Sequence, residues 1–134
     1  MEARCACGAI GIATDASAIF IILCHCLECQ RRTGAPFGAG VYYPGPDIRI
    51  SGDPGEYARG TESGGTMRNR FCARCGSTVW WTIDAHPELV GVALGTFATP
   101  VPNVPVHSLW ERSRCSWVAF EGVTERHPLG FPQA

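Results

Sequence analysis

The chain has 134 residues, a length typical of one domain, and apolar residues make up 46 % of it, enough to build a hydrophobic core. The net charge is −1 and no run of like charges occurs, which argues against nucleic-acid binding and against binding to a membrane surface. No apolar run reaches the roughly 18 residues of a membrane-spanning helix, and the N-terminus lacks the apolar segment of a signal peptide. We therefore expect a cytoplasmic protein whose cysteines are metal ligands or reactive thiols and not disulfides.

Short strands separated by turns are predicted along the chain. Sixteen glycines and ten prolines favour turns over long helices, and no window has a convincing helical period. One short helical turn is expected at about 27–33, after an apolar strand at 17–24. The other strands are expected at about 9–14, 37–43, 47–51, 66–71, 78–83, 89–94, 104–109 and 116–120.

This pattern predicts an all-β protein. Because we find no repeat and no linker, residues 1–134 are expected to form a single domain with a core at about 3–120. The last eight residues, HPLGFPQA (127–134), are expected to be a loosely held tail.

Two pairs of cysteines are candidates for a structural metal site. Cys5 and Cys7 lie just before a predicted strand, where residues two apart point to the same side of an extended chain. Cys72 and Cys75 form the zinc-knuckle pattern CARCG, in which Gly76 can adopt a positive φ. Together the two pairs offer four thiolates, the ligand set of a closed structural zinc site. Such a zinc would clip the N-terminal strand to a distant hairpin and contribute to folding directly.

A third cluster, CHCLEC (24–29), holds three cysteines, Cys24, Cys26 and Cys29. Three protein ligands with an open fourth position are typical of a catalytic zinc. Three thiolates make such a zinc a poor Lewis acid but a good partner for a soft ligand such as a substrate thiolate, which favours thiol chemistry over peptide hydrolysis. Because an open thiolate site can lose its metal and oxidise, this second zinc could be lost in purification.

Several residues near these clusters leave alternatives open. Cys115 could close the second site as a fourth ligand, or could be an unligated, partly buried cysteine. His25 lies between two expected ligands, so alternation directs it to the opposite face, as a supporting or core group. His107, in a predicted strand, could be an acid–base group or a core histidine. Trp80 and Trp81 alternate across one strand, so one belongs to the core and the other could line a pocket.

The order of these motifs is similar to that of the glutathione-dependent formaldehyde-activating enzyme family, also called the centromere protein V/formaldehyde-activating domain. The pattern runs C-x-C-G, C-H-C-x-x-C-Q-R-x-T-G-x-x-F, F-C-x-x-C-G-S and H-x-x-W over about residues 3–118. The flanking residues that also agree with the family are Gly8, Arg32, Gly34, Phe37, Phe71, Gly76 and Trp110.

The resemblance implies a fold, two metal sites and a reaction. The fold would be Mss4-like, or β-tent, with curved antiparallel sheets stapled by a structural zinc. The reaction would add glutathione to formaldehyde to give S-hydroxymethylglutathione, a carbon–sulfur lyase reaction run in the synthetic direction. The implied ligands are Cys5, Cys7, Cys72 and Cys75 for the structural zinc and Cys24, Cys26 and Cys29 for the catalytic zinc.

The leading hypothesis is therefore a zinc-dependent carbon–sulfur lyase or synthase with two zinc ions per chain, acting on a small thiol or thiol–aldehyde adduct. Arg31 or Arg32 would hold a substrate carboxylate through paired hydrogen bonds, unless both are solvated surface arginines. His107 is the candidate acid or base. Two alternatives share this pattern: a zinc-stabilised binding module for a protein partner, which needs no open metal position, and a thiol carrier that binds without turnover.

Overall fold

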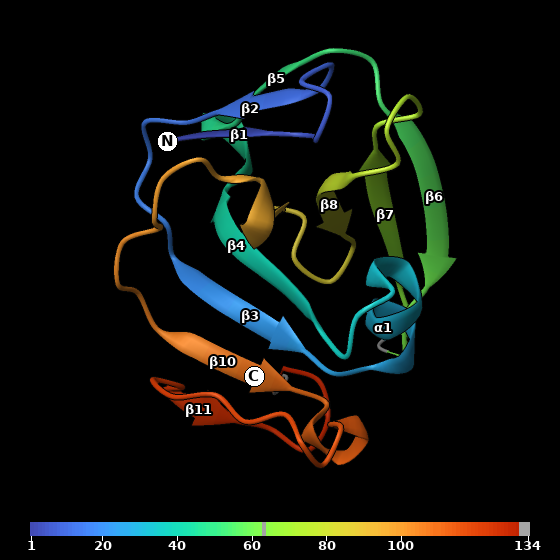
Figure 1. Ribbon diagram of the computed structural model, residues 1–134, viewed down its shortest axis with the longest axis vertical. Coiled ribbons are helices and arrows are strands. Elements are labelled where there is room, and N and C mark those ends of the chain that lie inside the picture. Colours follow the sequence, from blue (N-terminus) through green and yellow to red (C-terminus); the bar gives the residue numbers. More distant parts are fainter. Residues whose placement is uncertain (63, 132–134) are drawn as a thin grey trace.

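The computed structural model describes residues 1–62 and 64–131. In the described residues α1 is the single α-helix and the other main elements are short strands, as can be followed in Figure 1, which confirms the all-β prediction. The elements are β1 Glu2–Arg4, β2 Gly11–Ala13, β3 Phe20–Cys24, α1 Leu27–Thr33, β4 Gly38–Pro44, β5 Arg49–Ser51, β6 Gly55–Gly60, β7 Thr66–Phe71, β8 Thr78–Ile83, β9 Leu89–Ala93, β10 Val106–Leu109 and β11 Glu125–Arg126, with 3-10 turns η1 Gly45–Asp47, η2 Leu94–Thr96 and η3 Glu111–Ser113.

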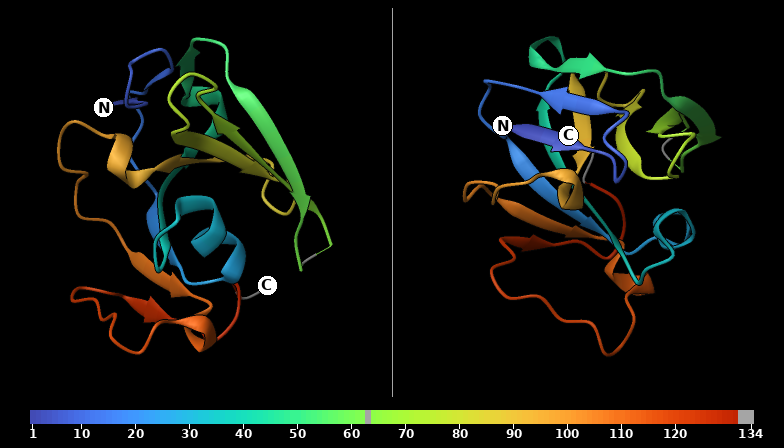
Figure 2. Two further views of the ribbon diagram at one scale, coloured as in Figure 1. Left: turned by 45° about the vertical axis from the view of Figure 1, so that its right-hand side comes forward. Right: turned by 45° about the horizontal axis from the view of Figure 1, so that its top comes forward.

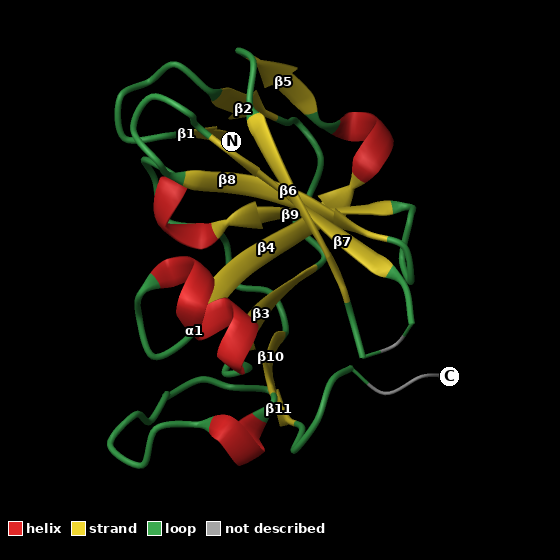
Figure 3. Ribbon diagram, turned by 90° about the vertical axis from the view of Figure 1, so that its right-hand side faces the viewer, coloured by secondary structure: helices red, strands yellow, loops and turns green. Residues whose placement is uncertain are grey.

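The strands form two sheets, as expected for the Mss4-like class. A small antiparallel sheet has the order β1-β2-β5, and a larger one has the order β11-β10-β3-β4-β9-β8-β7-β6. Figure 3 shows the small sheet at one end of the molecule and β10 and β11 at the other. Neighbours in the larger sheet are antiparallel except at β10, which pairs in parallel with both β3 and β11.

Alternation along β4 separates the hydrophobic core from the opposite face of the sheet. Val41 and Tyr43 are fully buried in a cluster that also draws on the small sheet. Tyr42, between them, points the other way, as residues of a strand alternate between faces. The core residues are Ala3, Cys5, Ile10, Ile12, Val41, Tyr43, Cys72, Val79, Val90 and Val92.

The helix α1 is short but has a defined start and end. The Cys26 Sγ accepts a hydrogen bond from the Cys29 N–H at 3.3 Å, which caps the N-terminus. Gly34 ends the helix at φ 65°, with its N–H bonded to the Gln30 carbonyl at 2.8 Å. The helix contacts β4, and Figure 2 shows it in the angle between the two ends of the larger sheet. The predicted turn at 27–33 is thus confirmed.

Two predictions about the C-terminal part were wrong. Residues 116–120 are not a strand: the Val118 N–H bonds the Cys115 carbonyl in a turn, and Trp117 is 75 % exposed. Residues 127–131 are not loose, because the His127 N–H bonds the Ser108 carbonyl and the Trp110 N–H bonds the Leu129 carbonyl. Residues 132–134 of the expected tail lie outside the described residues.

Within the part of the chain that the structure describes, no helix has both the length and the apolar character to cross a membrane.

Candidate active site

Four cysteines from two distant turns meet beside the small sheet. The Sγ atoms of Cys5 and Cys7, just after β1, lie within 4.8 Å of those of Cys72 and Cys75, in the turn between β7 and β8. The Cys7 Sγ is 3.7 Å from the Cys5 Sγ and 3.6 Å from the Cys72 Sγ. Thiolates around a tetrahedral zinc with bonds of about 2.3 Å would be about 3.8 Å apart. The spacing therefore fits the zinc-ligand set predicted from the sequence.

The backbone around this cluster favours the metal-binding geometry. The Ile10 N–H donates to the Cys5 Sγ at 3.2 Å, as amides commonly do to thiolate ligands. Gly76 has φ 81°, the left-handed conformation expected for a knuckle glycine, and its N–H bonds the Cys72 carbonyl at 2.7 Å. The Ala6 N–H also donates to the Ser77 Oγ at 3.1 Å, so the two turns are joined by protein contacts as well.

The second cluster lies where β3 passes into α1. Cys24 ends β3, Cys26 caps α1 and Cys29 is buried in its first turn, and their sulfur atoms all lie within 4.8 Å of one another. Hydrogen bonding with the Cys24 thiol, aided by Cys29 and by the Arg59 guanidinium, holds the pKa of Cys26 well below its usual range. The same thiol contacts raise the pKa of Cys24. A cation bound among the three sulfur atoms would lower the pKa of all three thiols and favour thiolates at all three positions.

A cavity of about 850 Å³ opens onto this cluster. All three sulfur-bearing residues line it, and the opposite wall comes from β7, β8 and the C-terminal segment. A smaller cavity of about 360 Å³ adjoins it and shares Glu28, Arg31, Arg32 and Arg59 with it. The three thiols are therefore open to a small molecule, whereas the four-cysteine cluster lines neither cavity.

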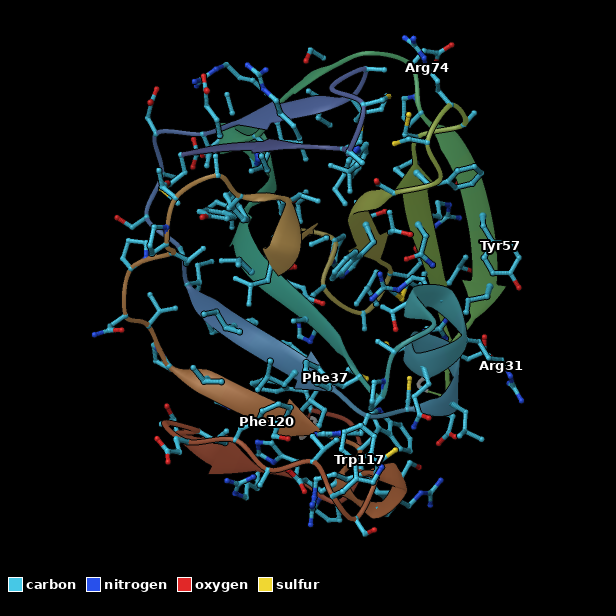
Figure 4. All side chains as sticks on the ribbon, viewed as in Figure 1. Arg31, Phe37, Tyr57, Arg74, Trp117 and Phe120 are labelled. Carbon is cyan, nitrogen blue, oxygen red and sulfur yellow. The ribbon has the colours of Figure 1, made fainter. Side chains whose placement is uncertain are left out.

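The two arginines predicted to bind substrate occupy different environments. Arg31 is 71 % exposed, pairs with Glu28 at 3.0 Å, and points outward in Figure 4. Arg32 instead lies over the Trp81 ring, with its Cζ 4.8 Å from the ring centroid, and its buried Nε has no hydrogen-bond partner. The structure therefore favours Arg32 over Arg31 as an anion-binding group.

A further arginine of the cavity comes from β6, a strand that was not predicted. Arg59 donates to the Gly60 carbonyl and to the Met67 Sδ, both at 3.3 Å. Among the described residues neither Arg59 nor Arg32 forms an ion pair. Both guanidinium groups can therefore donate hydrogen bonds to a bound carboxylate. The sequence carries no signal for Arg59, because the sheet alone brings β6 to the cavity.

Trp81 forms the cavity wall between these cations and the thiols. The ring lies over Gly40 and Gly91, where an added Cβ atom would collide with it. The Trp81 Nε1–H donates to the Tyr42 hydroxyl at 2.9 Å. Burial raises the pKa of Tyr42 to about 12, so its hydroxyl stays protonated and can donate its own hydrogen. Of the predicted tryptophan pair, Trp81 is the one that lines the cavity, and Trp80 packs against the core.

Behind the three-cysteine cluster lies a buried polar network that sequence reasoning missed. His25 is fully buried and points away from the cavity, as alternation predicted, with its Nε2 3.0 Å from the Ser108 Oγ. The Ser108 hydroxyl donates to the Glu111 carboxylate, which also binds Arg114 at 2.9 Å and Arg126 at 3.2 Å. Burial lowers the pKa of His25, so this histidine is held neutral. Through His25, the network holds the chain between Cys24 and Cys26 on the side away from the cavity.

The remaining candidates lie elsewhere. His107 does not line the cavity; its ring packs against Phe131 and lies beside Glu125 and His127. Cys115 belongs to neither cysteine cluster within the described chain, so the four-ligand alternative for the second site has no support.

Comparison with known proteins shows the family of the chain. A family model described as glutathione-dependent formaldehyde-activating enzyme (GFA) matches residues 1–113. The chain belongs to the GFA family. Membership supports an enzyme with a formaldehyde-activating, glutathione-related function in general.

A solved structure supports the fold separately. The crystal structure of a Rhodobacter sphaeroides protein matches this GFA-family chain with a TM-score of 0.59 and 24 % identity, covering 79 % of this chain and 99 % of that chain. At that identity the likeness shows the fold alone. No curated protein matches the chain.

Proposed function

We propose that this GFA-family chain is a zinc-dependent carbon–sulfur lyase or synthase that acts on a small thiol bearing a carboxylate, or on its adduct with an aldehyde. The observation that carries this proposal is the gathering of Cys24, Cys26 and Cys29 within 4.8 Å at the wall of a cavity of about 850 Å³. Glutathione, named in the family description, is one thiol of this class. The proposal includes a single-domain organisation and a cytoplasmic location.

Cys24, Cys26 and Cys29 would hold the catalytic zinc. The four-cysteine cluster beside the small sheet would hold a structural zinc. Their thiol donors suit zinc, and three ligands leave one position for substrate. When bound, such a zinc supplies Lewis-acid stabilisation of a substrate thiolate or of an aldehyde oxygen. The Cys26 and Cys29 positions are held by the cap of α1, which keeps these donors in place through turnover.

Arg32 and Arg59 would orient the substrate through its carboxylate. A guanidinium offers paired donors to a carboxylate, and the flat face of Arg32 is already fixed by Trp81. The buried Nε of Arg32 gains a partner when an anion binds, which removes the cost of leaving a donor without one.

Tyr42 would donate a hydrogen bond to the substrate oxygen. Its hydroxyl accepts from Trp81 and remains protonated at neutral pH, so its own proton is available as a donor. In the synthetic direction the new carbon–sulfur bond forms as the carbonyl π bond breaks, and the electron pair moves to oxygen. A fixed donor stabilises that developing charge and a proton from solvent completes the hydroxyl group.

The test is acceleration of hydroxymethyl exchange between glutathione and ¹³C-formaldehyde, followed by NMR with zinc-loaded protein. We expect exchange above the uncatalysed rate with glutathione or with another carboxylated thiol. Thiol binding without faster exchange would support the carrier alternative, and absence of any thiol binding would leave the binding-module alternative.

Adjacent arginines provide a matched pair of variants. Arg32→Gln should raise KM by about tenfold or more, because loss of one charge-assisted bond costs about 1.5–3 kcal/mol. Arg31→Gln, which removes the same charge from the exposed neighbour, should change KM by less than about twofold. Equal effects would disprove the assignment of Arg32.

A further inference from the structure

A third group of possible metal ligands lies on the edge of the larger sheet, apart from both cysteine clusters. His107 on β10 pairs in register with Glu125 on β11, and His127 follows two residues later. Residues two apart in extended chain share a face, so all three side chains lie on one side of the sheet. Their potential ligand atoms all lie within 4.8 Å of one another.

The geometry converges on a single carboxylate oxygen. The Glu125 Oε2 is 3.5 Å from the His107 Nδ1 and 3.3 Å from the His127 Nε2. Both nitrogens are buried, and among the described residues neither has a hydrogen-bond partner. A buried polar atom without a partner costs free energy, and a cation between these three atoms would satisfy both nitrogens at once.

Aromatic rings and backbone bonds hold the two imidazoles in place. The rings lie at an interplanar angle of 22°, with centroids 5.8 Å apart. The Phe131 ring packs against both imidazoles, with its centroid 4.9 Å from that of His107 and 5.7 Å from that of His127. The Thr124 N–H and the His127 N–H bond the Val106 and Ser108 carbonyls, each at 2.8 Å, which fixes β11 on β10. The donors are thus positioned by the fold before any ion binds.

We propose that His107, Glu125 and His127 form a binding site for a divalent transition-metal ion such as zinc. Two imidazole nitrogens and one carboxylate oxygen are a donor set for zinc and related ions, unlike the all-sulfur cysteine clusters. The carboxylate is 58 % exposed at the side chain, whereas the histidines are 12 % and 14 % exposed, so an ion enters from the Glu125 side.

The proposed ion would fasten the C-terminal segment to the sheet. Leu129, Gly130 and Phe131 line the large cavity, and only Pro128 separates them from His127. An ion joining β10 to His127 therefore ties down one wall of the cavity at a distance from the thiols. The role assigned to it is structural, and it places no substrate at the histidines.

The experiment titrates Co²⁺ into protein whose cysteine clusters are already filled with zinc, as verified by elemental analysis. We expect one further equivalent of Co²⁺ per chain, without a sulfur-to-metal charge-transfer band, and a rise in Tm upon binding. Glu125→Gln and His127→Gln should each weaken this binding by at least about tenfold, since even a lost outer-shell partner costs a metal site that much.

The chain supplies a matched control in His86, which lies 3.5 Å from Glu88 as an exposed pair without a second histidine in a described cluster. His86→Gln should leave Co²⁺ binding unchanged. Because Glu125 is exposed, its variant should fold even if His127→Gln does not. Absence of the extra equivalent, a sulfur charge-transfer band, or equal binding by Glu125→Gln would overturn the proposal. None of these readouts depends on the activity of the protein.

Discussion

The two cysteine clusters offer the same ligand atom, sulfur, but differ in how far apart their cysteines lie in the sequence and in whether they face a cavity. The four-cysteine cluster joins two turns far apart in the sequence, and the cavities do not reach it. The three-cysteine cluster comes from six consecutive residues, and it faces a cavity while a buried polar network supports it from behind. Ligands distant in sequence can stabilise a fold by linking its parts. Three ligands close in sequence link little of the chain, and a tetrahedral metal held by only three protein ligands would have one position open toward the cavity.

The largest effect is expected from Cys72→Ser, which removes one of the four linking thiols. If this cluster binds the proposed structural zinc, metal binding contributes to folding, and the free energy of unfolding should fall by more than about 4 kcal/mol. Chemical denaturation combined with metal analysis measures this. Cys115→Ser is the control, because Cys115 joins neither cluster, and equal stability of the two variants would contradict a structural role for the four-cysteine site.

Cys26→Ser should distinguish the role of the three-cysteine cluster from that of the four-cysteine cluster. The exchange rate should fall by more than about 100-fold, which corresponds to about 2.7 kcal/mol of transition-state stabilisation. Serine is itself a good N-cap residue, so α1 keeps its cap and the variant should lose far less stability than Cys72→Ser. Metal content should drop by one ion per chain. Retained activity, or unfolding as severe as in Cys72→Ser, would show that the two clusters do not divide their roles in this way.

Gly40→Ala tests the cavity wall that distinguishes the second cluster. The added Cβ would collide with the Trp81 ring, so we expect a loss of about 1–3 kcal/mol in unfolding free energy and a shift in tryptophan fluorescence. At Gly60 a Cβ meets nothing within 4 Å, which makes Gly60→Ala the control, with a change within about 0.5 kcal/mol. If both variants behave alike, Trp81 does not depend on the glycine.

The smallest effect is expected from Glu111→Gln, which weakens the network behind the three cysteines. Burial acts to raise the pKa of Glu111, but hydrogen bonds from Ser108, Arg114 and Arg126 outweigh it and the pKa is lowered. A carboxyl whose pKa is lower in the folded state stabilises the fold above its unfolded pKa, about 4.3, and loses that contribution as pH falls.

The stability difference between wild type and Glu111→Gln should therefore be largest near pH 7 and should shrink below about pH 4. Urea unfolding at a series of pH values measures it, with Glu28→Gln as an exposed control that pairs with Arg31 alone among the described ion pairs. If the stability of wild type and that of Glu111→Gln change with pH in parallel, the Glu111 carboxylate does not contribute to stability through this network.

The two cysteine pairs, the three-cysteine motif and α1 could be predicted because their signals are local, whereas the meeting of the two pairs was expected from the four ligands that a structural zinc takes. Cysteine spacing specifies which thiols can share an ion, and Cys26 and Gly34 mark the two ends of the helix. The strands 66–71 and 78–83 agree with β7 and β8 for the same reason, since alternation and the intervening turn lie within a few residues. These features depend on neighbours along the chain, so the sequence contains them directly.

The rest of the site depends on pairing between distant segments. Arg59 reaches the cavity because β6 pairs with β7, and Ser108 lies behind His25 because β10 pairs in parallel with β3. The apolar run at 116–120 resembles a strand, but Arg114 donates to the Val118 carbonyl and the segment turns. β6 is an edge strand with largely exposed side chains, so it lacks the alternation that would have revealed it.

The parallel pairing of β10 with β3 has a consequence for how the chain acquires its structure. β3 ends at residue 24 and β10 begins at residue 106. During synthesis the edge of β3 that pairs with β10 therefore has no partner strand until most of the chain has been made. Its apolar sequence, FIILC, is then an unpaired edge of the kind that joins other chains. Pairing over such a separation is slow compared with hairpin formation. Folding intermediates of this protein should therefore aggregate through β3, and yield on refolding should improve as the chain concentration is lowered.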